Sequence, residues 1–429
     1  MMILLRATLA LLLLMPLLAV RAESGYGYPL HNPFEATIAG TPTALMPVLP
    51  ADKHIRQKDY SLNLRPQRAE RLPGNFWPVK HFKYRLARQT GPAPLIYLIA
   101  GTGARYDAQA MEYLKKLFYG AGFHVVQLSS PTSYDFMVGA SRHATPGFSP
   151  LDAAELYQLM QTIRQRHPRL NITDEHLAGY SLGALQAAFI SELDSREQKI
   201  GLQRVLMLNP PVNLLTSVSN LDRMANVTLD EVTAGQSFYQ SLFDRLAHFF
   251  ERRGRFDVSE AMLFEFQQSR DRLDNQQLAM LIASVFRFAA ADISYVADLI
   301  NRRGLITPHG TRISDASSLT PYFRQALMCD FNCYLREQLL PFWQQHYQPH
   351  GSLSQLAQAT SLYAIEQHLS DNPQIRVMHN ADDIILGEGD LDWLHRVLGQ
   401  RLRVYPHGGH LGNMTYATNA VAMLEFFHD

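Results

Sequence analysis

A serine between two glycines is the clearest chemical signal in this sequence. Gly179, Ser181 and Gly183 form a Gly-x-Ser-x-Gly pattern, which is entered from an apolar run at Leu177 and followed by apolar residues at helical spacing. This context predicts a strand, a sharp turn at the serine and then a helix. Side chains at either glycine would clash with neighbouring backbone in such a strained turn. Ser181 is therefore a candidate nucleophile, and the free N–H groups at the start of the helix would point toward it.

A serine hydroxyl is a poor nucleophile unless a base removes its proton. His410 follows two glycines after the last predicted strand and is the candidate base, with His407 as the fallback. Adjacent carboxyl groups, Asp382 and Asp383, follow the preceding strand. One of them would hold the imidazole tautomer and stabilise its charged form. These groups suffice for acyl transfer, so we expect neither a metal nor an organic cofactor.

A glycine-rich turn, Gly101-Thr102-Gly103, follows the continuous apolar run at residues 94–100. Such a turn presents backbone N–H groups to an anion, either a phosphate or the oxyanion of an acyl-transfer intermediate. The turn lacks the spacing and the Lys-Ser/Thr pair of a P-loop, and it precedes the serine turn by one strand–helix unit and a strand. We therefore interpret it as part of an oxyanion site and expect the N–H groups of Leu182 and Thr102 to be the donors.

Strand and helix patterns alternate through residues 81–211 and resume at 372–429, which predicts an α/β fold with a doubly wound, mostly parallel sheet. Within the first part, residues 132–147 are expected to form a loop. The intervening residues 212–371 have helical spacing, including an apolar stripe at 242–250, and are interpreted as an inserted helical cap. A cap can exclude water and shape a substrate pocket. Residues 23–80 are rich in proline and predict an arm that wraps the core, with an edge strand near 35–38 and no catalytic signal.

Together these motifs resemble the α/β-hydrolase superfamily. The chain has that family's order of serine, acid and histidine, each at a strand end. Residues 382–386 resemble its Asp-x-Ile-Val-Pro turn, and this register favours Asp382 as the acid, so that Asp383 would cap or bond a loop. Residues 408–410 resemble its Gly-Gly-His turn. Ala100 stands where the family often has histidine in its oxyanion loop. The resemblance covers residues 81–211 and 372–429 and implies a serine hydrolase.

The N-terminus has the features of a secretory signal. Arg6 provides the positive end, an apolar run covers residues 9–20, and small residues allow cleavage near Ala22. We therefore expect residues 1–22 to be removed, a periplasmic or secreted protein, and no integral membrane span in the mature chain. Cys329 and Cys333 are the two cysteines of the sequence. In an oxidising compartment such neighbours form a disulfide or remain free thiols.

The balance of charged residues bears on which classes of partner the protein binds. Lys plus Arg and Asp plus Glu both number 39, so no basic surplus indicates nucleic acid. The favoured function is hydrolysis of an ester or thioester, with a small-molecule or lipid-like acyl substrate suggested by the large cap. Two alternatives stay open: a serine peptidase or amidase, and a catalytically idle binding module of the cell envelope. The sequence leaves the oligomeric state undetermined.

Overall fold

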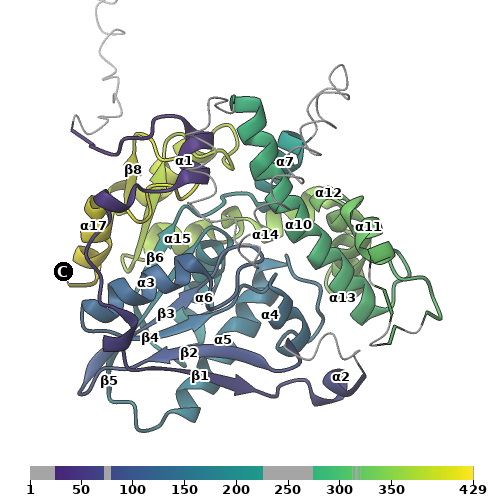
Figure 1. The fold of residues 1–429 in the computed structure, drawn as a ribbon, viewed down its shortest axis with the longest axis horizontal. Coiled ribbons are helices and arrows are strands. Elements are labelled where there is room, and N and C mark those ends of the chain that lie inside the picture. The colour runs from purple at the N-terminus through teal and green to yellow at the C-terminus, as the bar shows by residue number, and fades with distance from the viewer. Residues whose placement is uncertain are drawn as a thin grey trace, which may run out of the picture.

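The computed structural model describes residues 25–71, 79–225 and 274–428, apart from residues 312, 315, 316 and 319. The predicted signal at 1–22 and the helical stripe at 242–250 lie outside these ranges, so both stay predictions. Described segments form one large sheet with helices on both faces and a further group of helices at one side (Figure 1).

An eight-stranded sheet is the centre of the molecule, with the strand order β1-β2-β4-β3-β5-β6-β7-β8. Strands β1, β2 and β4 pair antiparallel, and the pairs from β4 to β8 are parallel. The strands are β1 Gln57–Leu62, β2 Phe82–Ala87, β3 Ala93–Ile99, β4 His124–Leu128, β5 Ile172–Tyr180, β6 Leu202–Leu208, β7 Ile375–Asn380 and β8 Leu402–Tyr405. The prediction of a doubly wound, mostly parallel sheet is confirmed.

Apolar side chains on both faces explain why helices cover the sheet twice. Leu95 and Tyr97 of β3 face one layer of helices, whereas Ile96 and Leu98 face the other. A strand covered on both faces needs a continuous apolar run, and β3 has one. The first layer contains α5 Ser149–Arg166, α6 Leu182–Glu197 and α16 Asp390–Leu398, and the second contains α3 Gln109–Gly120 and α17 Ala417–His428.

Between β6 and β7 the described elements are helices, which pack into a third apolar cluster beside the sheet (Figure 1). The longest is α10, Asn275–Asn301, which begins with a capping box formed by Asp274 and Gln277. The others are α7 Leu214–Ala225, α11 Thr320–Leu327, α12 Phe331–Tyr334, the π-helical turn η5 Leu335–Leu339, α13 Leu340–His346, α14 Leu353–Thr360, the 3-10 turn η6 Leu362–Ile365 and α15 Glu366–Asp371. Cys329 and Cys333 form a disulfide where α12 begins, with their Cα atoms 5.1 Å apart.

Two local expectations are wrong. Residues 35–38 belong to helix α1, Pro33–Ala39, and not to an edge strand. Asn32 caps this helix by accepting hydrogen bonds from two backbone N–H groups, and Pro33 occupies the first turn, where its missing N–H costs nothing. The edge strand is β1, further along the arm. The segment 132–147, expected to be a loop, contains helix α4, Tyr134–Gly139, capped by Ser133.

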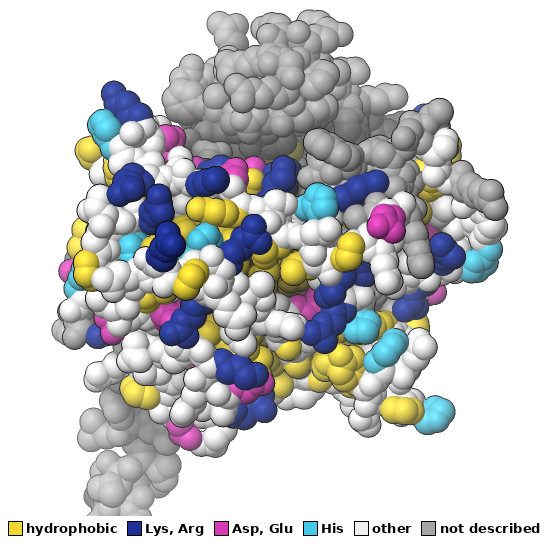
Figure 2. Space-filling model, turned by 90° about the horizontal axis from the view of Figure 1, so that it is seen from below, with side chains coloured by type: hydrophobic (Ala, Val, Ile, Leu, Met, Phe, Trp, Pro, Cys, Tyr) yellow, Lys and Arg dark blue, Asp and Glu magenta, His cyan; other side chains and the backbone are white. Residues whose placement is uncertain are grey.

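The surface carries charges of both signs. On the face shown in Figure 2, Lys and Arg side chains are more prominent than carboxylates, and both lie scattered among apolar side chains. Of the described helices, α10 is long and apolar enough to cross a membrane by length and composition alone. Most of this helix is buried against the rest of the protein, as is usual for a core helix.

Candidate active site

Ser181 occupies a sharp turn between β5 and α6. Its backbone has φ of 53° and ψ of −126°, which is a strained conformation for a residue with a side chain. The turn is held in place because the Ser181 N–H donates to the Leu208 carbonyl of β6 at 2.8 Å. The residue is 8 % exposed, so little of it faces water. The predicted strand, turn and helix are all present.

The flanking glycines are required by the close approach of backbone segments. A Cβ atom on Gly179 would lie 2.1 Å from the Gly183 carbonyl oxygen. A Cβ on Gly183 would lie 2.3 Å from the carbonyl oxygen of Ile99, in the neighbouring strand β3. These distances are far below a van der Waals contact, and the atoms met are backbone atoms that cannot rotate away. The pattern therefore serves a steric purpose at both of its glycines.

The side chains of Ser181, His410 and Asp383 meet at the same edge of the sheet. The Ser181 Oγ lies 2.9 Å from the His410 Nε2, and the His410 Nδ1 lies 3.0 and 3.1 Å from the two carboxylate oxygens of Asp383. A carboxylate at Nδ1 favours the tautomer with its proton on that nitrogen. The Nε2 lone pair then accepts the hydrogen bond from the serine hydroxyl. This is the geometry of a nucleophile, a base and an orienting acid.

The structure corrects the acid from Asp382 to Asp383. The turn after β7 is closed by the Asp383 N–H, which donates to the Asn380 carbonyl, and it directs the Asp383 carboxylate to His410. The Asp382 carboxylate instead accepts hydrogen bonds from the N–H groups of Gly408 and Gly409, at 3.2 and 2.9 Å. Burial raises the pKa of Asp382. Asp382 therefore braces the turn that carries His410 without contacting the imidazole.

Asp383 is held as a charged acceptor. Burial alone would raise the pKa of its carboxyl, but the facing His410, together with His379 and the Asn209 amide, outweighs burial and holds that pKa below its ordinary value. Asn209 donates to one carboxylate oxygen at 2.8 Å, and the N–H of Ile385 donates to the other at 3.1 Å. The buried carboxylate is thus satisfied on both oxygens, as a charge away from water must be.

Sequence reasoning missed Asn209 and His379. Asn209 directly follows β6 and has φ of 47°, and an asparagine directly before two prolines at a strand end was the available signal. His379 is fully buried, and its Nδ1 lies 3.6 Å from an Asp383 oxygen. Burial lowers the pKa of His379. The fallback base His407 is not brought to the serine, because its Nε2 donates to the Tyr28 carbonyl at 2.7 Å.

The predicted oxyanion donors lie beside Ser181. A Cβ on Gly101 would come within 3.1 Å of the Ser181 Cβ, so this turn abuts the nucleophile. The Ala104 N–H closes the turn by bonding to the Gly101 carbonyl at 3.1 Å, and the Gly103 N–H donates to the Thr132 hydroxyl at 2.8 Å. Neither bond uses the Thr102 N–H.

Leu182 is the first residue of α6, so its N–H has no carbonyl one turn earlier within the helix. The cap helix α10 lies over the facing turn, because a Cβ on Gly103 would be 3.4 Å from the Ala289 Cβ. The start of α6, the glycine-rich turn and α10 therefore lie close to one another beside Ser181. Within the described ranges, no cluster of three or more His, Cys, Asp or Glu side chains could hold a metal ion.

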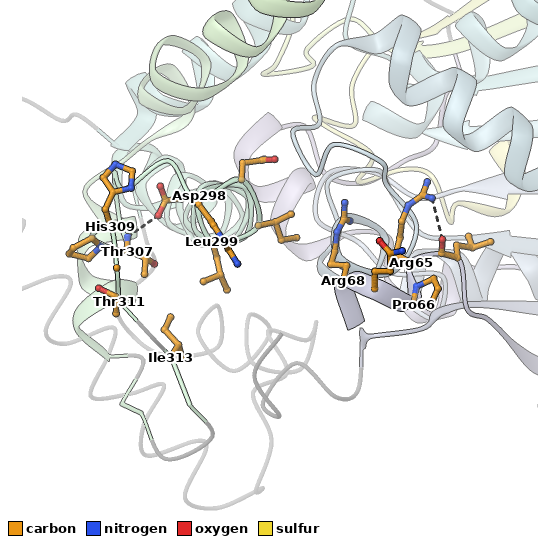
Figure 3. A pocket seen from close by; sticks show the side chains of 16 residues that line it. Arg65, Pro66, Arg68, Asp298, Leu299, Thr307, His309, Thr311 and Ile313 are labelled. Carbon is orange, nitrogen blue, oxygen red and sulfur yellow. Dashed lines mark hydrogen bonds between the residues drawn. The ribbon is translucent and has the colours of Figure 1, made fainter. Parts of the chain in front are cut away.

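A separate cavity of about 1130 Å³ lies between α2, Pro66–Arg71, and the C-terminal end of α10. Figure 3 shows Arg65 and Arg68 on one side and Asp298 and His309 on the other. The Asp298 carboxylate already accepts from the N–H groups of residues 305–307. The lining contains none of the residues that converge on Ser181, so this cavity is not the place of the acyl-transfer geometry.

Solved structures with a similar chain path include enzymes that act on esters. The chain is similar to a fungal esterase from Rhizomucor miehei, at 14 % identity and a TM-score of 0.44 over 94 % of this chain and 98 % of that one. It is similar to a putative hydrolase from Legionella pneumophila, at 10 % identity and a TM-score of 0.45 over 92 % and 93 %. It is also similar to brefeldin A esterase, a bacterial homologue of human hormone-sensitive lipase, at 13 % identity and a TM-score of 0.42 over 93 % of this chain and 80 % of that one. Comparison of the sequence with protein-family models and with curated proteins gives no match.

Proposed function

We propose that this chain, which has an α/β-hydrolase fold, is a serine hydrolase that cleaves esters or thioesters through an acyl-enzyme intermediate. One observation carries the proposal: the Ser181 Oγ lies 2.9 Å from the His410 Nε2, while Asp383 occupies the opposite nitrogen of the same ring. Nothing in the packing of the core requires a buried hydroxyl, imidazole and carboxylate in series. Their alignment is the arrangement that activates a serine.

In the proposed reaction, His410 takes the proton of the Ser181 hydroxyl while the oxygen attacks the substrate carbonyl carbon. The resulting oxyanion accepts hydrogen bonds from the N–H groups of Leu182 and Thr102. His410 then gives the proton to the departing alcohol or thiol, and the acyl group stays on Ser181. Water, deprotonated by His410, releases the acid and restores the serine. Asp383 keeps the imidazole in the required tautomer throughout.

The surroundings of the site support an apolar acyl group. The cap cluster packs apolar residues of α10 and α12 against α4, and α10 places Ala289 over the glycine-rich turn. An apolar wall next to the serine gains free energy by covering a hydrocarbon chain, at about 25 cal/mol per Å² buried. We therefore propose a small-molecule or lipid-like acyl ester as the substrate.

We also propose that the protein is exported, to a bacterial periplasm or outside the cell. The apolar N-terminal run with its small-residue cleavage site near Ala22 supports this. The Cys329–Cys333 disulfide is consistent with it, because such bonds persist in oxidising compartments. N-terminal sequencing of the protein recovered outside the cytoplasm should begin near Glu23. Recovery of the chain in the cytoplasm with its first residues intact would contradict export.

The decisive experiment combines a fluorophosphonate probe with a series of p-nitrophenyl esters of increasing acyl length. We expect probe labelling at Ser181 and ester hydrolysis, both abolished in Ser181→Ala. Ser195→Ala is the matched control, because Ser195 is an exposed serine on the same helix whose hydroxyl donates to a helix carbonyl. Loss of activity in the control, or absence of labelling in the folded wild type, would contradict the proposal and favour a binding module. Hydrolysis of amides but not esters would favour a peptidase.

A further inference from the structure

The arm at residues 25–62 reaches the turn that carries His410. Helix α1 lies next to this turn, although the two are separated by more than 370 residues in the sequence (Figure 1). The His410 N–H donates to the Thr37 Oγ1 at 2.8 Å. We infer that Thr37 is a positioning residue for His410 and that α1 thereby helps to hold the active-site geometry. The inference rests on the proposed function, since it assigns Thr37 a task in the same reaction.

The Thr37 hydroxyl is oriented to accept. Its own proton is donated to the Pro33 carbonyl at 2.6 Å, one turn earlier in α1. A hydroxyl whose proton is committed in this way presents its lone pairs to other donors. The His410 N–H meets one of them. The backbone of the proposed base is therefore fixed by a side chain of the arm, and its imidazole is fixed by Asp383.

Further contacts bind the arm to the same turn. The Thr41 hydroxyl donates to the Gly412 carbonyl at 3.0 Å, and the His407 ring donates to the Tyr28 carbonyl. Backbone of the two segments approaches so closely that a Cβ on Gly409 would lie 2.1 Å from the Pro33 carbonyl oxygen. A Cβ on Gly412 would lie 2.0 Å from the carbonyl oxygen of Ala36. Because glycines at these positions have no Cβ, the backbone of α1 can pack directly against the turn.

The arm also contacts the cap. The Asn32 side chain donates to the Asn275 side chain at the start of α10, and Phe34 and Ile38 pack against the apolar cluster of the cap helices. Helix α1 thus fills the space between the His410 turn and α10 (Figure 1). From the opposite side the turn is braced by Asp382 and by Asn380, whose amide donates to the Gly409 carbonyl at 2.7 Å. These inner braces hold Gly408 and Gly409, whereas the His410 N–H itself rests on Thr37.

The test compares full-length Thr37→Val with Thr37→Ser and the wild type. Valine keeps the branched shape but leaves the His410 N–H without its acceptor, so the imidazole loses its fixed distance to Ser181. We expect kcat to fall about tenfold with KM changed less than about twofold, because the missing bond affects the reacting geometry and not substrate contacts. Thr37→Ser keeps the hydroxyl and should restore kcat to within about twofold. Thr162→Val, which removes an exposed helix hydroxyl of the same kind, should leave kcat unchanged.

A second measurement distinguishes failure of the inference about Thr37 from failure of the proposed function. The rate of fluorophosphonate labelling at Ser181, followed as a time course, does not depend on how much protein is folded, and it should fall in Thr37→Val by the same factor as kcat. Wild-type kcat and labelling rate in folded Thr37→Val would overturn the inference while leaving the proposed function intact. An unlabelled wild type would instead remove the proposed function. If Thr37→Val does not fold, Gly409→Ala displaces the same arm atoms with its added Cβ; an unchanged kcat there would equally overturn the inference.

Discussion

The serine turn and the histidine turn meet at one hydrogen bond but are built in opposite ways. The serine turn is made by its own neighbours in the sheet: β5 leads in, α6 leads out, and β3 and β6 hold its backbone. The histidine turn is assembled from remote parts, namely the arm, the end of β7 and the segment after β8. The serine turn has a sequence pattern that can be recognised in a short stretch. The contacts that hold the histidine turn can be recognised only in the structure.

The largest effects are expected from adding one methyl group to each turn by a Gly→Ala substitution. Gly183→Ala adds a Cβ 2.3 Å from the β3 backbone, which is buried and cannot yield. We expect a loss of more than about 4 kcal/mol and no soluble folded protein. Gly409→Ala adds a Cβ whose nearest neighbours all belong to the arm. It should fold, with the arm displaced and kcat reduced. Thermal unfolding of both variants checks this, and a folded Gly183→Ala would contradict the contrast.

The next test exchanges the two adjacent carboxylates. Asp383→Asn presents an amide to the His410 Nδ1 and favours the wrong tautomer, so kcat should fall about 10⁴-fold. Asp382→Asn keeps an oxygen for only one of the two N–H groups of Gly408 and Gly409, so it weakens this brace but leaves the carboxylate at the imidazole in place, and kcat should fall about tenfold or less. Steady-state kinetics of the pair measure both effects. Equal losses in the two variants would show that the carboxylates share one task.

A pH experiment examines the strand that leads to the serine. His176 of β5 is buried between Phe123 and Phe427, and burial lowers its pKa from 6.5 to about 4. The unfolded chain takes up this proton at a higher pH than the folded one, so stability is complete above pH 6.5 and falls as the pH drops toward 4. The loss at pH 5 is about 2 kcal/mol.

His176→Leu removes this proton and should flatten the acid side of the stability curve, while the stability at pH 7 changes by less than about 1 kcal/mol. Urea unfolding at pH 7 and pH 5 provides the measurement. An unchanged difference between the two pH values in the variant would mean that other groups, such as His379, cause the acid sensitivity.

The smallest effect is expected from the disulfide, which touches neither turn. Replacing Cys329 and Cys333 by serine opens a loop of a few residues, and the entropy of closing so short a loop corresponds to about 2 kcal/mol at most. We expect a modestly lower midpoint of thermal unfolding and ester hydrolysis within about twofold of the wild type. A large fall in kcat would show that the cap is coupled to the catalytic geometry more tightly than the contrast allows.

The same contrast explains what could be predicted from the sequence. Ser181 and the strand-turn-helix around it can be recognised from a pattern of five residues, although the backbone that excludes a side chain at Gly183 belongs to β3. His410 follows from two glycines at a strand end. Asp383 could not be separated from Asp382, because a shift of one residue in a turn reverses the direction of the carboxylate, and the hydrogen bond from the Asp383 N–H decides it. Adjacent acids with no local constraint leave such a choice to the packing of the whole sheet edge.

Other features were missed although local signals were present. Asn32 before Pro33 is the signal of a helix start, but the many prolines of the arm favour extended structure and hide this signal. Ser133 similarly starts α4 within a segment rich in loop-forming residues. The contact of Thr37 with His410 has no local signal at all. It depends on a pairing across 373 positions, which no periodicity within one chain segment can indicate.

The ribosome makes Thr37 of the arm 373 residues before it makes His410. The serine turn can form once β3, β5, α6 and β6 have been made, but the proposed base lacks its contact with the arm until the histidine turn has been made as well. Partially made or N-terminally clipped chains therefore contain the nucleophile without its full catalytic partner. On the proposed function, hydrolysis therefore requires the arm to be seated on the histidine turn, and a protease that trims the arm would lower the activity without cutting the sheet.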